Sequence, residues 1–176
     1  QCLQLDDPAE AWPFVAAPIS AYYRNQETRD GALVRIASED LPQYFLNAGD
    51  VVGEYSTQPG GSPNGNPSRT TVDPYGNIWV GNRSDNLFPS PNGLGLRGSV
   101  TRVGLVLGGT RIGNDLIGPF QYCTCEDRNG DGRITTSVGY PHILGAGDYQ
   151  NTVLAWPGTQ ASTEASAVDE CITKYV

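Results

Sequence analysis

The chain has 176 residues, which favours one domain and at most two small ones. Its 11 basic and 19 acidic residues give a net charge of −8, and Lys174 is the only lysine. Nucleic acids and anionic membrane surfaces need clustered lysine and arginine, and a membrane-spanning helix needs roughly 20 apolar residues, so we expect no nucleic-acid partner and no membrane insertion.

Two short segments in the first part of the chain resemble each other. GALVRIA at 31–37 is echoed 67 residues later by GSVTRVG at 98–104, and each copy leads into another β-prone stretch. Repeats on this scale are typical of propeller blades and repeat arrays. We therefore expect one β-rich domain, 1–176, with blade-like repeats at about 12–56 and 69–107.

A β-hairpin is predicted within the second repeat. The segment RTTVDPYGNIWVGNR at 69–83 consists of two β-prone runs around DPYGN at 73–77, where proline fixes φ and glycine accepts positive φ. The stretches on either side, 56–71 and 84–97, are rich in Gly, Pro, Asn and Ser, and we expect them to be surface loops.

Two features of the sequence bear on glycans. Asn82 in Asn82-Arg83-Ser84 is the candidate N-glycosylation site, because proline excludes the motif at 66–68. The aromatic residues are candidates for a glycan-binding surface, but we favour the core for them, above all for Trp79, which alternates with Ile78 and Val80. The aromatic candidates are Trp12, Tyr22, Tyr23, Tyr75, Trp79 and Trp156.

A calcium loop is predicted at 127–138. The run DRNGDGRI at 127–134 spaces hard oxygen ligands at alternate positions, which wraps them around one point. The ligands are Asp127, Asn129, Asp131 and the backbone carbonyl of Arg133. Position 12 of the loop is Val138, in place of the bidentate glutamate of an EF-hand, so we expect weak Ca²⁺ binding. A turn without a metal is the alternative.

Four cysteines, Cys2, Cys123, Cys125 and Cys171, allow three disulfide pairings. A Cys123–Cys125 bridge would close too small a ring, which leaves two patterns, and we favour Cys125 with Cys171 and Cys2 with Cys123. A four-thiolate zinc site is the alternative, but the chain lacks the CxxC spacing of such sites.

The favoured pairing has two consequences. It brings Asp169 and Glu170 close to the calcium loop, which makes them candidate extra ligands. The cysteine count, the acidic composition and the scarcity of lysine together predict a secreted, extracellular or cell-surface protein.

A C-terminal helix is predicted at about 163–175. Apolar residues recur there at spacings of three and four, which is one stripe of a helix, and Ser162 or Thr163 is a suitable cap. Cys171 lies on this stripe, so the disulfide would pin the helix to the rest of the domain.

The run NPSRTTVDPYGNIWVGNR at 66–83, followed by GSVTRVGL at 98–105, resembles the blades of NHL-type, streptogramin-lyase-like β-propellers. The segment TCEDRNGDGRITTS at 124–137 resembles a dockerin-like calcium loop inserted in some exported bacterial propellers of this kind. The resemblance covers about residues 29–138. It implies antiparallel sheets arranged as propeller blades.

Two blades are too few to close a propeller, and such repeats need neighbours to cover their flanks. The cover comes from further blades, from a sandwich-like closure by the chain's own ends, or from other copies. An exposed strand edge is a template for pairing between chains, and a head-to-tail contact that does not close produces a filament. We therefore expect a calcium-stabilised structural protein that self-associates in a cell-surface or extracellular polymer.

Two other functions remain open from the sequence, a carbohydrate- or ligand-binding propeller module and a lyase-like propeller enzyme. His142 is the only histidine, and no serine or cysteine nucleophile is recognisably paired with it. The lyases of this family use a histidine in the central funnel, and His142 falls outside the blade-like hairpin that would place it there. We therefore expect no enzyme and assign no catalytic residue.

Overall fold

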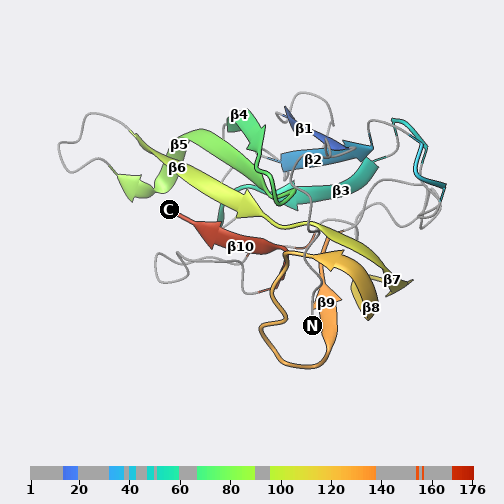
Figure 1. Ribbon diagram of the computed structural model, residues 1–176. Helices are drawn as coiled ribbons and strands as arrows, with labels where there is room; N and C mark the ends of the chain where they lie inside the picture. Colours follow the sequence, from blue (N-terminus) through green and yellow to red (C-terminus); the bar gives the residue numbers. More distant parts are fainter. Residues whose placement is uncertain are drawn as a thin grey trace.

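A computed structural model gives the fold of residues 14–19, 32–37, 40–42, 47–49, 51–59, 67–89, 96–137, 154, 156 and 168–176. These residues contain ten strands, paired antiparallel in three sheets (Figure 1). The predicted mostly-β fold is confirmed. No helix among these residues is long and apolar enough to cross a membrane.

The first sheet covers the first expected repeat. It consists of β1 (Phe14–Ile19), β2 (Ala32–Ala37) and β3 (Val51–Ser56), in the order β1-β2-β3. Leu33 of β2 lies opposite Tyr55 of β3, and both side chains are buried. The buried face of this sheet packs toward the second sheet.

The second sheet covers the second expected repeat and adds one strand. It consists of β4 (Pro67–Val72), β5 (Ile78–Pro89), β6 (Leu96–Val103) and β10 (Ile172–Tyr175), in the order β10-β6-β5-β4. The predicted hairpin is confirmed, because β4 pairs with β5 across the turn at 73–77. Gly76 closes this turn with a φ of 73° and donates its N–H to the Asp73 carbonyl.

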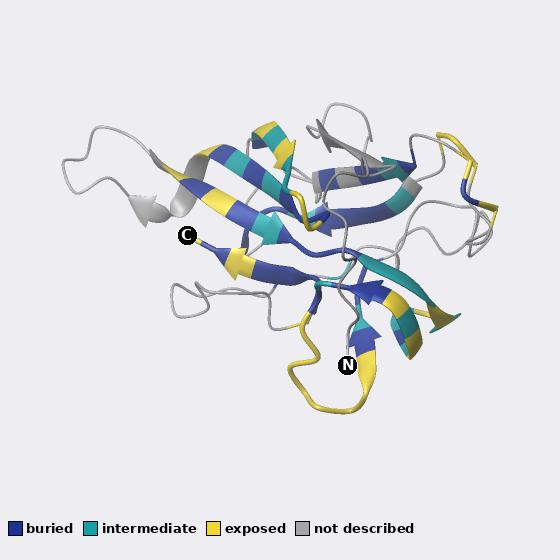
Figure 2. Cartoon of the chain, viewed as in Figure 1, coloured by how far each residue is buried: buried dark blue, intermediate teal, exposed yellow. Residues whose placement is uncertain are grey.

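The third sheet follows directly and carries the predicted calcium loop. It consists of β7 (Val106–Ile112), β8 (Asp115–Cys123) and β9 (Arg133–Thr135), in the order β7-β8-β9. The loop connects β8 to β9 and forms the exposed arc at the bottom of Figure 2. The three sheets do not close into a barrel within the described residues, and their identity as propeller blades stays a prediction.

The predicted C-terminal helix is wrong where the structure describes it. Residues 172–175 form β10, which pairs with β6, while 163–167 lie outside the described residues. The edge of β6 needs hydrogen-bond partners, and Val176 exchanges two backbone hydrogen bonds with Val100 there. A bulge between Ile172 and Lys174 buries both Ile172 and Tyr175, so a bulged strand produces the spacing that indicated a helix.

Both predicted surface loops are shorter than expected. Residues 67–72 form β4, residues 84–89 belong to β5, and 96–97 belong to β6. Thr57 and Gln58 are buried. Pairing with neighbouring strands satisfies the backbone of these polar segments, which composition alone does not reveal.

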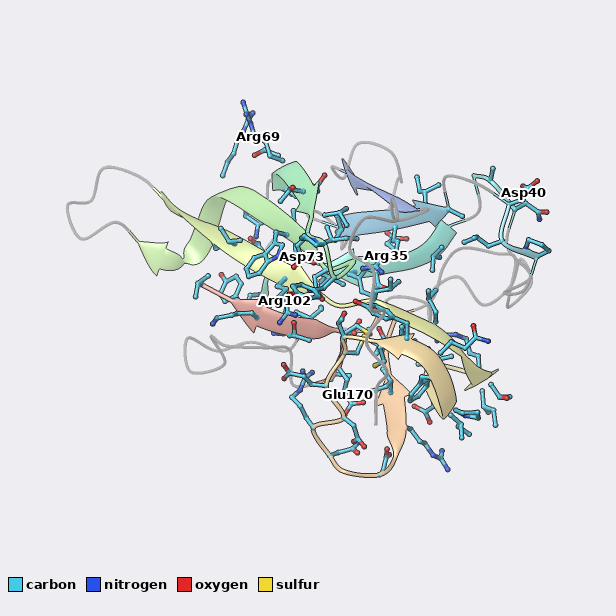
Figure 3. The ribbon with its side chains drawn as sticks, viewed as in Figure 1. Arg35, Asp40, Arg69, Asp73, Arg102 and Glu170 are labelled. Carbon is cyan, nitrogen blue, oxygen red and sulfur yellow. A yellow bond between two sulfur atoms is a disulfide. The ribbon has the colours of Figure 1, made fainter. Side chains whose placement is uncertain are left out.

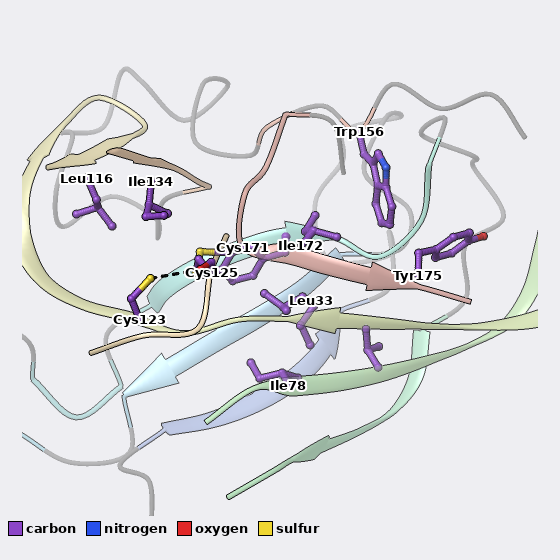
Figure 4. Packing of buried hydrophobic residues seen from close by; sticks show 13 residues of the cluster. Leu33, Ile78, Leu116, Cys123, Cys125, Ile134, Trp156, Cys171, Ile172 and Tyr175 are labelled. Atoms are coloured by element: carbon purple, nitrogen blue, oxygen red, sulfur yellow. Dashed lines mark hydrogen bonds between the residues drawn. A yellow bond between two sulfur atoms is a disulfide. The ribbon is translucent and has the colours of Figure 1, made fainter. Parts of the chain in front are cut away.

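One hydrophobic core joins the three sheets (Figure 4). The first sheet contributes Leu33 and Tyr55, the second Ile78 and Ile172, and the third Leu116 and Ile134, among others. Trp156 packs edge-on against Tyr175, with 5.2 Å between the ring centroids. Of the aromatic residues predicted to be in the core, Trp156 is buried, whereas Tyr75 is exposed.

The core prediction for Trp79 is wrong. Ile78 and Val80 are buried on one face of β5, so the alternation turns Trp79 to the opposite face, where it is partly exposed. Trp12, Tyr22 and Tyr23 lie outside the described residues.

Candidate metal centre

The predicted calcium loop is exposed and turns on two glycines. Gly130 and Gly132 have φ values of 74° and 79°, in the left-handed region that favours glycine. Residues 126–133 are all exposed. The loop therefore stands in solvent with its ends held by β8 and β9.

The three predicted side-chain ligands organise the backbone of the loop. The Asp127 carboxylate accepts hydrogen bonds from the N–H of Gly130 at 2.7 Å and of Gly132 at 2.9 Å. The Asn129 side-chain oxygen accepts from the N–H of Asp131 at 2.8 Å, and the Asp131 carboxylate accepts from Arg133 at 2.9 Å. These bonds fold the loop into successive Asx turns.

The Cys125–Cys171 disulfide is confirmed and anchors the start of the loop. Both cysteines are buried, and their Cα atoms are 4.3 Å apart. The bond joins the segment after β8 to the segment before β10, 46 residues apart in sequence. Cys2 lies outside the described residues, so the pairing of Cys2 with Cys123 stays a prediction.

Glu170 clamps both ends of the loop. One carboxylate oxygen accepts the N–H of Arg128 at 3.0 Å, and the other accepts the N–H of Thr135 at 2.8 Å. Its backbone accepts from Glu126 and donates to the Thr135 carbonyl. Glu170 therefore lies beside the loop, as the pairing of Cys125 with Cys171 led us to expect (Figure 3). Its carboxylate contacts backbone N–H groups at both ends of the loop.

Asp169 is also beside the loop, but it is buried. Its carboxylate accepts hydrogen bonds from Thr136 Oγ1 at 2.8 Å, Ser137 Oγ at 2.6 Å, Ser137 N and Cys171 N. Burial raises the pKa of Asp169, and the hydrogen bonds from Ser137 and Thr136 oppose that shift. Asp169 thus joins the end of β9 to the start of β10.

Arg128 makes a third connection between the loop and the segment before β10. Its guanidinium donates to the Asp169 carbonyl at 2.6 Å and to the Ile172 carbonyl at 3.4 Å. An open hollow beside it is lined by Arg128, Asn129, Thr135, Val168 and Glu170. Sequence reasoning missed the role of Arg128, because nothing in the motif marks the side chain at that position.

The donor set has the chemistry that Ca²⁺ prefers, but it has few charges. Asp127, Asn129, Asp131 and the Arg133 carbonyl offer only oxygen, the hard ligand that suits calcium. Within the described part of the chain, His, Cys, Asp and Glu do not gather in groups of three or more that could hold a metal ion. Two carboxylates and one amide fit a weak calcium site, and the role of Asp169 and Glu170 as extra ligands stays a prediction.

The glycosylation prediction at Asn82 conflicts with the fold. Asn82 is buried in β5, and its Nδ2 donates to the Thr57 carbonyl at 2.9 Å and to Ser99 Oγ at 3.0 Å. A glycan is attached through this nitrogen, so it would break one of these bonds and would need space inside the fold. The motif is accessible only before the strand forms.

Sequence reasoning also missed Arg35, which joins the first two sheets. Its buried guanidinium donates to the Gly104 carbonyl at 2.8 Å and to the carbonyls of Val103 and Gly76 at 3.4 and 3.5 Å. The repeat contained the signal, because Arg35 and Arg102 occupy the same position of its two copies.

His142 lies outside the described residues. Comparison of the chain with protein-family models, with curated proteins and with solved structures found no match. The resemblance to propeller blades therefore stays a prediction.

Proposed function

We propose that this chain is an exported, non-catalytic structural subunit that Ca²⁺ stabilises and that self-associates in a cell-surface or extracellular polymer. The observation that carries the calcium part is the organisation of the loop, whose three side-chain oxygen ligands already accept the backbone N–H groups of residues 130–133. A metal ion bound to these oxygens would hold the β8–β9 connection closed.

The anchors of the loop support a structural role for the ion. Cys125, Arg128 and Glu170 connect the loop to the segment that leads into β10, and β10 completes the second sheet. Calcium at the loop would therefore stabilise the junction of two sheets. The energy of ion binding would add to the stability of the folded state by mass action.

The open sheets support self-association. Each of the three sheets ends in two edge strands within the described residues, and edge strands are templates for pairing between chains. We assign the chain no catalytic residue.

The calcium part is tested by thermal unfolding with and without CaCl₂. For a dissociation constant of about 10⁻⁴–10⁻³ M, a calcium concentration of about 10 mM should add roughly 1.4–2.7 kcal/mol, which raises Tm by several degrees. The variant Asp127→Ala/Asp131→Ala should lose this shift, and the matched variant Asp40→Ala, at an exposed aspartate that also accepts a loop N–H, should keep it. A wild-type Tm that calcium leaves unchanged contradicts the proposal.

Self-association is tested on the same protein by sedimentation velocity and electron microscopy. We expect polymers whose amount rises with concentration. A chain that stays monomeric at every concentration contradicts this part of the proposal, whatever calcium does to Tm.

A further inference from the structure

We propose that the outer face of the sheet β10-β6-β5-β4 is the surface on which a second copy of this chain docks, through contacts between basic side chains and an acidic surface. The inference rests on the proposed self-association and names the surface that performs it. The outer face is defined by Arg69, Trp79, Val100, Arg102, Lys174 and Val176.

The strand register places these residues together. Arg102 lies opposite Trp79 on one side and Lys174 on the other, and Gly81 lies between Arg69 and Val100. Residues directly opposite in antiparallel strands point to the same face. The alternate residues, such as Val80 and Thr101, are buried against the core, and Figure 2 shows exposed bands beside buried bands on β6 and β10.

This sheet is basic although the chain is acidic. Its four strands contain five of the 11 basic residues and one acidic residue, Asp85, so the rest of the chain has six basic and 18 acidic residues. A second copy that approaches this face therefore presents a surface of opposite charge. The five basic residues are Arg69, Arg83, Arg97, Arg102 and Lys174.

The first copy of the internal repeat shows how the equivalent face is packed elsewhere in the same chain. In the first copy, Leu33 and Arg35 are buried against the neighbouring sheet, where Arg35 donates to the backbone carbonyl of Gly104. In the second copy, the equivalent residues are Val100 and Arg102. Val100 is 37% exposed, so the equivalent face lacks such a cover from the described residues.

Arg102 is half-buried at the centre of this face. Its guanidinium lies over the Trp79 ring at 5.9 Å from the centroid. The indole N–H of Trp79 is held by Asp73 at 3.0 Å, which fixes this stacked pair. The partly exposed guanidinium of Arg102 would meet carboxylates or carbonyls of a docking copy, as the guanidinium of Arg35 meets the Gly104 carbonyl.

The face also has exposed apolar surface beside its charges. Val100 and Val176 are joined by two backbone hydrogen bonds, and Val176 is 65% exposed. An apolar centre with a charged rim is typical of protein interfaces. Because the basic face of one copy meets an acidic surface at another place on the next copy, the contact is heterologous, and its repetition gives a filament when the rotation between copies does not close a ring.

Lys174 is the only lysine of the chain, so lysine acetylation reports on this one side chain of the face. Acetylation of Lys174 is followed by mass spectrometry in dissociated and in assembled protein, and we expect its rate to fall about tenfold or more on assembly. A carbodiimide should also join Lys174 to an Asp or Glu of another copy in a mixture of ¹⁴N and ¹⁵N chains. Assemblies in which Lys174 reacts as fast as in the monomer overturn the inference.

Paired variants test the same face. Val100→Asp/Lys174→Glu should weaken association about tenfold or more, whereas Ile112→Asp, at an exposed apolar residue of β7, should leave it unchanged. Circular dichroism shows that each variant folds. Raising the NaCl concentration should weaken association of the wild type. If the double variant assembles as well as the wild type, this inference is wrong and the proposed function stands; if the wild type never assembles, the proposed function itself is wrong.

A carbohydrate is the competing occupant of the face. An oligogalacturonate is the probe, because its carboxylates and sugar rings match the arginines and Trp79. If the oligogalacturonate slows acetylation of Lys174 in the monomer, and assembly of the chain does not slow it, the face is a glycan site. That result overturns the inference.

Discussion

Two side chains, those of Arg35 and Tyr122, connect parts of the fold that are far apart in the sequence. The guanidinium of Arg35 lies between two sheets and donates to the carbonyls of Val103 and Gly104 (Figure 3). Tyr122 of the third sheet donates its hydroxyl proton to the Tyr75 carbonyl in the β4–β5 turn. Both contacts end on the backbone of turns or strand ends, so they fix the positions of whole elements.

Asp73 has a comparable role in the hairpin turn. Partial burial would raise the pKa of its carboxyl group, but hydrogen bonds from Asn77 and Trp79 and from the N–H groups of Asn77 and Tyr75 outweigh it and lower the pKa. A lowered pKa in the folded state contributes stability above the unfolded value of about 3.9, and that contribution is lost as pH falls through the folded value.

We therefore predict that Asp73→Asn lowers stability at neutral pH and reduces the loss of stability between neutral and strongly acidic pH. Urea unfolding at a series of pH values measures both effects. Thr71→Asn, at an exposed position of the same hairpin, is the matched control and should keep the wild-type pH profile. Equal acid profiles for Asp73→Asn and the wild type would contradict the role given to this carboxylate.

At the level of elements, the predicted calcium loop and β10 form one unit. The disulfide, the Glu170 carboxylate and the Arg128 guanidinium all connect them. The short strand β10 has only four residues, and these connections hold it in place against β6.

Removal of the disulfide by Cys125→Ala/Cys171→Ala should lower the free energy of unfolding by about 4 kcal/mol, because a bond between residues 46 apart restricts the unfolded chain. Urea denaturation measures the change, and the β-sheet circular dichroism spectrum shows that the variant folds. A loss below about 1 kcal/mol would mean that the bond restrains little of the unfolded ensemble.

The hairpin prediction and the C-terminal prediction had opposite outcomes for a physical reason. The hairpin at 69–83 depends on residues within a few positions of each other, so local chemistry was enough to predict it. The end of the chain is a strand because β6, about 70 residues away, offers an edge there. Local spacing does not contain that information.

On the scale of the whole molecule, one core joins all three sheets. Ile172 of the second sheet is fully buried in this core, which also contains residues of the first and third sheets, and Figure 4 shows it beside the Cys125–Cys171 bond. A shared core makes the sheets depend on one another. We therefore expect unfolding in one cooperative transition.

Ile172→Ala should lower the free energy of unfolding by about 2–5 kcal/mol, because it leaves a cavity where the sheets meet. Lys174→Ala, at an exposed position of the same strand, is the matched control and should change it by about 0.5 kcal/mol or less. Tryptophan fluorescence and circular dichroism should report the same urea midpoint for each protein. Separate midpoints would show that the sheets unfold independently.

The sequence by itself determined the mostly-β class and the hairpin, and it narrowed the cysteine pairings to two, of which the favoured one contains the Cys125–Cys171 bond. These follow from alternation, turn residues and the small number of feasible cysteine pairs, which act over short distances or through simple geometry. Only the tertiary structure decided that Arg35 joins two sheets, that Asn82 is buried and that Trp79 faces outward. Each of these depends on which sheet packs against which face, and that is a property of residues far apart in the chain.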